Sequence, residues 1–195
     1  MGAILGLLNV YGMVLTPVLR LGRQLAWVCI GLMTLIILAQ VFFRYIVGSA
    51  LPWPDEAARF LMLWMTAFIA PSAYRWGGFV SIDLLSDFLP KRVAALLALF
   101  FLVVSLVVLV VAAQFGWKHV NSGWLFASST LRVPMDLIGG KAFKIKLAWM
   151  YMSLFLTMVL MAIVNVELIL KAVAKFIDPQ ADVPDDPDAG FIGAE

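Results

Sequence analysis

Charged residues are scarce in this chain. Only 13% of its 195 residues are charged and 64% are hydrophobic, whereas ordinary globular domains have about 25% charged and about 45–50% apolar residues. A soluble domain of this length needs a polar surface that such a composition cannot supply. The mean hydropathy of +1.00 therefore indicates an integral membrane protein, with lipid as the solvent for much of its surface.

Residues that carry chemistry are also few. Cys29 is the one cysteine and His119 the one histidine, so neither an intrachain disulfide nor a cluster of cysteine and histidine ligands can form. No His-Glu-x-x-His, Gly-x-Ser-x-Gly or phosphate-binding glycine motif is present. The basic residues are scattered and form no stripe that could follow a nucleic-acid backbone. We therefore expect no enzyme activity, no catalytic residue, no cofactor and no metal site, and no nucleic acid as a partner.

Long apolar segments dominate what remains. A helix that crosses the hydrocarbon core needs about 20 apolar residues, and four segments approach or exceed that length: Leu25–Tyr45, Ala57–Tyr74, Val93–Phe115 and Leu147–Leu170. The second is the least clean, because Arg59 lies in its first turn and Pro71 in its last. The sequence predicts an all-α integral membrane fold with four transmembrane helices, which form a membrane domain over residues 25–177.

Two further segments are predicted to lie in the membrane interface. Residues 1–19 are largely apolar but lack the basic start and the small-residue cleavage site of a signal peptide. A fifth span is the alternative, although Asn9, Thr16 and Pro17 interrupt the segment. We expect an interfacial helix over residues 1–24 that bends near Pro17 and Gly22. Val80–Leu89 has a helical pattern of apolar and polar residues, which predicts a short amphipathic helix between the second and third spans.

The connections and the tail complete the predicted organisation. Gly116–Lys146, between the third and fourth spans, is expected to be the largest loop outside the membrane, with aromatic and lysine residues suited to an interface. Residues 178–195 are acidic and proline-containing, and we expect them to be disordered. The 14 Lys and Arg residues divide equally between the two sides of the membrane, so the positive-inside rule does not fix the orientation.

A pathway for a solute is not evident within the spans. An independent transporter is expected to have an ionisable group within a span or paired broken helices around a midplane site, and the sequence has neither. Glu167 lies near the end of the fourth span with Lys171 one turn later. This spacing predicts an ion pair at the end of a helix.

The most organised charges surround the connection between the first two spans. Pro54 is suited to begin a helix whose dipole favours Asp55 and Glu56, and Arg44 at the end of the first span is placed to pair with Glu56. Two interpretations stay open: an anchored hairpin, and a contact with a partner or a solute. The residues concerned are Arg44, Trp53, Asp55, Glu56, Arg59, Trp64, Arg75 and Asp83.

These residues resemble a motif of the small membrane subunit of tripartite ATP-independent periplasmic (TRAP) transporters. The similarity includes the chain length, four spans and about 40 residues of motif. The matching positions are Arg44-Tyr45, Trp53 with Glu56, Arg59, Trp64, Arg75 and Ile82-Asp83. The chain departs from the family at Phe79, where a histidine is common, and at the start of the last helix, where a second proline is often seen.

The resemblance implies a role in solute uptake driven by an ion gradient. A large membrane permease subunit would hold the ion and solute sites, a periplasmic solute-binding protein would deliver a small carboxylate solute, and this chain would act as a scaffold. The resemblance also implies the bacterial inner membrane, with both termini cytoplasmic. Two alternatives remain: a stand-alone four-helix exporter, which would need a buried carboxylate that Leu25–Tyr45 lacks, and an anchor or assembly subunit of another complex.

Overall fold

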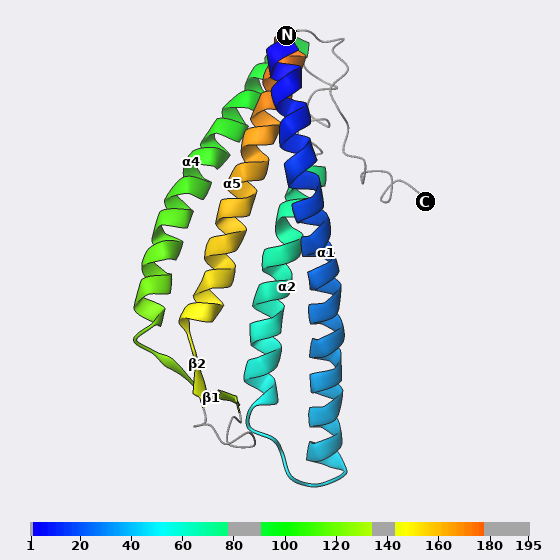
Figure 1. The fold of residues 1–195 in the computed structure, drawn as a ribbon, viewed down its shortest axis with the longest axis vertical. Coiled ribbons are helices and arrows are strands. Elements are labelled where there is room, and N and C mark those ends of the chain that lie inside the picture. Colours follow the sequence, from blue (N-terminus) through cyan, green and yellow to red (C-terminus); the bar gives the residue numbers. More distant parts are fainter. Residues whose placement is uncertain (1, 78–90, 134–142, 178–195) are drawn as a thin grey trace. The chain divides into compact units, whose positions relative to one another are not determined.

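The computed structural model describes residues 2–77, 91–133 and 143–177. These residues form four helices and two strands, which Figure 1 labels in chain order. The elements are α1 (Gly2–Tyr45), α2 (Pro54–Gly77), α4 (Lys91–Gly123), β1 (Ala127–Val133), β2 (Phe143–Lys146) and α5 (Ala148–Ile177). The predicted helix at Val80–Leu89 and the predicted disordered tail at 178–195 lie outside the described residues.

Three of the helices are long and apolar enough to cross a membrane: Gly6–Tyr45, Val93–Gly123 and Ala148–Ile177. The helical membrane fold is thereby confirmed. The remaining helix, α2, is the least apolar of the four, because it carries Asp55 and Glu56 in its first turn and Arg75 in its last. The count of four spans therefore stays a prediction.

The chain divides into two compact units. The first unit comprises Met1–Leu21, Ala70–Val111 and Val159–Glu195, and the second comprises Gly22–Ile69 and Ala112–Met158. Each unit takes a part of all four helices, and the two strands belong to the second.

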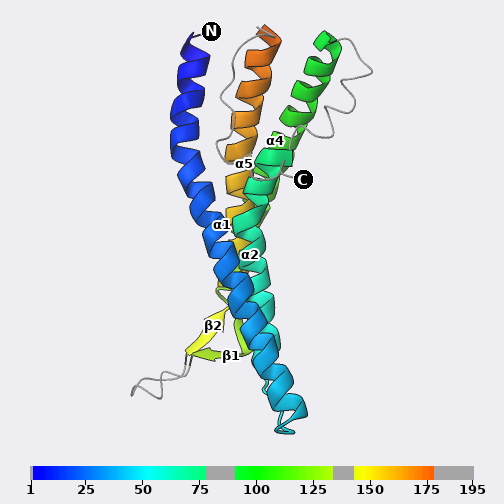
Figure 2. The ribbon, with the colours of Figure 1, turned by 90° about the vertical axis from the view of Figure 1, so that its right-hand side faces the viewer.

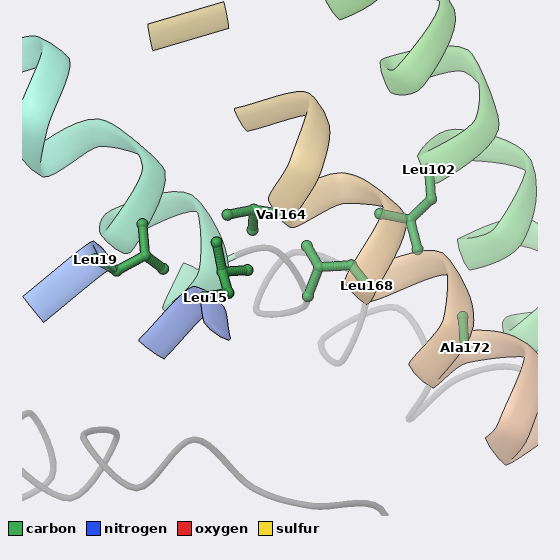
Figure 3. Close-up of a cluster of buried hydrophobic side chains, with 6 residues drawn as sticks. All are labelled: Leu15, Leu19, Leu102, Val164, Leu168 and Ala172. Carbon is green, nitrogen blue, oxygen red and sulfur yellow. The ribbon is translucent and has the colours of Figure 1, made fainter. Parts of the chain in front are cut away.

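An apolar cluster forms the core of the first unit. Figure 3 shows its side chains converging from α1, α4 and α5. The members are Leu15, Leu19, Leu102, Val164, Leu168 and Ala172. Leu19 and Leu168 are each 1% exposed, so α1 and α5 both contribute fully buried side chains to this core.

The start of the chain differs from the prediction. No boundary separates residues 1–24 from the first span, because α1 runs as one helix through Pro17 and Gly22 to Tyr45. A proline inside an apolar helix is tolerated where neighbouring side chains and helices satisfy the freed backbone groups. Whether this part of α1 lies in the interface stays a prediction.

The segment Gly116–Lys146, predicted to be the largest loop outside the membrane, contains helix and strand over most of its described residues, and its position relative to the membrane stays a prediction. Helix α4 continues to Gly123, and β1 and β2 pair antiparallel, with Ala127 opposite Lys146 and Val133 opposite Phe143. Figure 2 shows the two strands side by side. β-Branched and aromatic residues at these positions favour strands. At Gly123 a Cβ atom would lie 2.7 Å from Ala148 backbone atoms, so glycine permits the close approach of α4 and α5.

The connection between α1 and α2 is a short turn. Gly48 adopts a φ of 72°, a conformation that glycine takes readily, and the Ser49 amide donates a hydrogen bond to the Phe43 carbonyl at 3.0 Å. At the start of α2, the Ala57 amide donates to the Trp53 carbonyl at 3.1 Å. The turn therefore brings the end of α1 and the beginning of α2 together within the second unit.

Candidate functional site: two anchoring clusters

Glu56 anchors the beginning of α2 to β1 within the second unit. Its carboxylate accepts a hydrogen bond from the Thr130 amide at 3.0 Å and another from the Thr130 hydroxyl. Ser128 also contributes a side-chain hydrogen bond to Glu56, and its own oxygen accepts one from the Leu131 amide at 2.8 Å. The second unit therefore holds a hydrogen-bonded cluster of Glu56 with Ser128, Thr130 and Leu131, which we call the Glu56 cluster.

The protonation of Glu56 follows from these contacts. Burial raises the pKa of this carboxyl, but the hydrogen bonds from the Thr130 and Ser128 side chains, and from the backbone of Thr130 and Leu131, outweigh burial and leave the pKa below its usual value. Hydrogen bonds donated to a carboxylate favour its charged form. Glu56 is thus an anion at neutral pH.

Asp55 makes a separate contact with α1. The Gln40 amide donates a hydrogen bond to the Asp55 carboxylate at 3.1 Å. The two adjacent acidic residues therefore connect the first turn of α2 to different elements: Asp55 to α1, and Glu56 to β1.

The predicted ion pair between Arg44 and Glu56 was wrong. Both residues are among those that the structure describes, and no ion pair joins their side chains. Arg44 is exposed, and its guanidinium lies 5.7 Å from the ring centroid of Tyr45. Gln40, one turn earlier on α1, reaches the first turn of α2 instead. The hydrogen bonds to the Glu56 carboxylate come from β1, an element that the hairpin motif does not contain.

The other predicted residues of this segment have different surroundings. Trp53 is 39% exposed and Arg59 is exposed, so both lie on the surface of the second unit. Trp64 is half-buried and packs between Phe60 and Phe68, with ring centroids 6.3 Å and 5.4 Å away. Asp83 lies outside the described residues.

Arg75 lies in a second cluster, within the first unit. Its guanidinium donates to Glu167 at 2.7 Å and to the Thr16 hydroxyl at 3.0 Å. The Lys171 ammonium lies 3.1 Å from the same Glu167 oxygen, which confirms the predicted pair between Glu167 and Lys171. Because Thr16, Arg75 and Glu167 belong to α1, α2 and α5, this Arg75 cluster joins three helices.

The charged side chains of the Arg75 cluster are buried or half-buried. The side chains of Arg75 and Glu167 are 4% and 2% exposed, and that of Lys171 is 15% exposed. Two cations thus share one carboxylate. Beside them, the Asn165 amide donates to the Tyr74 hydroxyl at 2.6 Å, which adds a polar contact between α2 and α5. Burying charged groups is costly unless they are paired, so these contacts favour one arrangement of the helices in this unit.

Sequence reasoning identified Arg75 but missed its partner. Glu167 was assigned to Lys171 alone, because Arg75 lies far away in the sequence. The signal was nevertheless present, since a charged residue within an apolar helix needs a partner of opposite charge. Thr16, which was taken as an interruption of an apolar segment, is likewise a hydrogen-bond acceptor for Arg75.

The two clusters are suited to anchoring. The carboxylates of Asp55 and Glu56 accept hydrogen bonds from neighbouring elements, and that of Glu167 forms an ion pair with one. The described residues contain no group of three or more His, Cys, Asp or Glu side chains that could hold a metal ion.

Comparison with known proteins identifies the family. The model for the DctQ component of the tripartite ATP-independent periplasmic transporters matches residues 33–175, which include Glu56, Arg75 and Glu167. No curated protein and no solved structure gives a significant match. The family is a transporter component and not an enzyme family, and its members belong to the bacterial inner membrane. With long apolar helices of membrane-spanning length and a family match over most of its sequence, the chain belongs to the DctQ family, the small membrane component of TRAP transporters.

Proposed function

We propose that this chain is a scaffold for the large permease subunit of a TRAP transporter. The large subunit would bind the coupling ion and the solute, and a periplasmic binding protein would deliver a small carboxylate solute to the assembled complex. The family match over residues 33–175 carries the proposal.

The charge arrangement supports a structural role. Glu56 is engaged by donors of β1, and Glu167 by Arg75 and Lys171. A carboxylate that binds a transported ion must release its protein partners or share them with the ion, whereas these carboxylates connect one helix or strand to another. Such contacts fix the framework on which a partner can assemble.

The exposed apolar surface supports a membrane partner. The spanning window of α1 is 11% buried, and that of α4 is 22% buried. Lipid covers such surfaces in an isolated subunit, and a second membrane subunit can replace part of that lipid. We propose that α2 crosses the membrane as the fourth span and that both termini are cytoplasmic.

Reconstitution tests the scaffold role. The purified chain in liposomes should move no solute under a sodium or proton gradient, whereas the complex with the large subunit and the solute-loaded binding protein should. Uptake by this chain alone would contradict the proposal and favour the stand-alone transporter. The orientation is tested separately by reporter fusions active only in the periplasm: fusions at Gly123 should be active and fusions after Ile177 inactive, and the reverse pattern would contradict the assignment.

A further inference from the structure

A bulge interrupts the pairing of β1 with β2 within the second unit. Ala127 lies opposite Lys146 and Arg132 lies opposite Lys144, so β1 advances five residues between the two pairs while β2 advances two. The additional residues of a bulge have no residue opposite them on the neighbouring strand. The N–H groups of this part of β1 are therefore available to an acceptor outside the sheet.

The donors of the Glu56 cluster come from this bulge. The Thr130 amide donates a hydrogen bond to the Glu56 carboxylate at 3.0 Å, and the Thr130 hydroxyl donates another. The Ser128 hydroxyl and the Leu131 amide also contribute hydrogen bonds to this carboxylate. Two hydroxyls and two neighbouring amides thus converge on one anion, as in the concavities that backbone N–H groups form around anions. We call these four donors the β1 cradle.

The β1 cradle is organised by contacts within β1. The Ser128 side-chain oxygen accepts a hydrogen bond from the Leu131 amide at 2.8 Å, so these two donors hold each other in place. Ser128 is only 3% exposed, which restricts the positions that its hydroxyl can take. Because these contacts lie within one strand, the shape of the cradle does not depend on Glu56 alone.

Glu56 lies in the β1 cradle although a local partner is within its reach. It is the third residue of α2, and a glutamate at this position can bond back to the N–H group of the residue before the helix. The carboxylate instead accepts donors of a strand 74 residues further along the chain. Hydrogen bonds to a charged acceptor are stronger than those between neutral groups. The cradle therefore determines where this carboxylate lies.

We propose that the β1 cradle is a binding site for a carboxylate and that Glu56 is its tethered ligand. The ligand class follows from the donors, because the two oxygens of a carboxylate together accept about four hydrogen bonds, and the cradle offers two amides and two hydroxyls. Changing Glu56 to alanine removes two carbons and two oxygens, which are the heavy atoms of acetate. Acetate should therefore occupy the cradle of a Glu56→Ala chain. The proposal concerns this chain alone and does not depend on its transport role.

Thermal unfolding of the purified full chain in detergent tests the site, with sodium acetate and sodium chloride as the probes at equal ionic strength and neutral pH. Acetate should stabilise the Glu56→Ala chain, and chloride should not. At ten times its dissociation constant, acetate should raise the ratio of folded to unfolded chain about tenfold. The wild-type chain should show no such increase, because its own carboxylate fills the cradle.

Two further variants serve as controls. Asp55→Ala removes the adjacent carboxylate, which accepts a hydrogen bond from Gln40 of α1, so its removal leaves the cradle filled and acetate should not stabilise this variant. Thr130→Val keeps the branched side chain but removes one donor hydroxyl. In the Glu56→Ala chain, this second change should weaken acetate binding about tenfold, because a hydrogen bond to a charged group is lost.

Two results would overturn the proposal. Equal stabilisation of the wild type, Asp55→Ala and Glu56→Ala by acetate would mean a general salt effect or an adventitious ion only. Absence of an acetate effect on a folded Glu56→Ala chain would mean that the cradle has no affinity for an untethered carboxylate. Helicity and monodispersity of each variant are measured first. If Glu56→Ala does not fold, the stability losses of Glu56→Gln, Thr130→Val and their double variant decide: a double loss smaller than the sum supports the cradle, and additive losses contradict it.

Discussion

Replacing Glu167 by alanine should destabilise the first unit strongly. The carboxylate is the shared anion of Arg75 and Lys171, with nitrogen to oxygen distances of 2.7 Å and 3.1 Å. Removing it leaves two cations close together, and the Arg75 side chain is only 4% exposed. Removal of one partner from a buried ion pair costs about 3–5 kcal/mol. For a chain of this length, each kcal/mol lowers the melting temperature by about 2–4 °C, so the expected decrease is about 6–20 °C.

The assay is thermal unfolding in detergent, followed by the loss of monodisperse protein in size-exclusion chromatography. Lys175→Ala is the matched control, because Lys175 is exposed one turn beyond Lys171 on the same helix. The double variant Arg75→Met with Glu167→Leu should recover part of the lost stability, since it removes both members of the buried Arg75–Glu167 pair and the Lys171 ammonium can extend towards solvent. A melting temperature of Glu167→Ala within about 2 °C of the wild-type value would correspond to less than about 1 kcal/mol and would refute the reasoning.

Three further predictions concern the second unit. Glu56→Ala should lower the free energy of unfolding by about 1–3 kcal/mol, because the β1 donors lose their acceptor, whereas Arg44→Ala should change it by less than about 0.5 kcal/mol. Thermal unfolding of both variants measures this difference. Equal losses would favour the ion pair between Arg44 and Glu56 after all. The lowered pKa of Glu56 predicts that its contribution to stability is complete above the unfolded pKa of about 4.3 and is lost as the pH falls through the lower folded pKa. In Glu56→Gln, the acid side of a plot of unfolding free energy against pH should therefore be flatter than in the wild type. An unchanged plot would count against this. Gly123→Ala should cost about 1–3 kcal/mol, because the methyl group would meet the backbone of Ala148, whereas Gly31→Ala, which meets no atom within 4 Å, should be neutral or stabilising.

Composition and apolar segment length were sufficient to predict a helical membrane protein. The sequence of α4 and α5 left no alternative, because apolar segments of this length with so few charges have no stable place in water. The start of α1 was harder, since Pro17 reads as an end to a helix in a soluble protein and is tolerated in an apolar one. The strands were missed because β1 and β2 are short and contain polar residues such as Ser128, Thr130 and Lys144, so their pattern does not distinguish a strand from a connection.

Only those features of the two clusters that depend on neighbouring residues in the sequence could be predicted. Pro54, Asp55 and Glu56 indicate the beginning of a helix, because their effect depends on neighbours in the sequence. The partners of Glu56 and Arg75 depend on which distant elements pack together, and a sequence taken alone contains no such distances. A nearby opposite charge, Arg44, was therefore assigned to Glu56 in place of the uncharged donors on β1.

The two-stranded sheet has a consequence for the order of events during biogenesis. A pair of strands is marginally stable by itself, and β1 obtains extra contacts from Glu56, at the beginning of a helix formed much earlier in the chain. β2 leaves the ribosome after both β1 and α4, and it is followed directly by α5. The complete set of contacts of the sheet can therefore form only after the first turn of α2 and both strands have been synthesised, so that this extramembrane element is completed late in the synthesis of the chain.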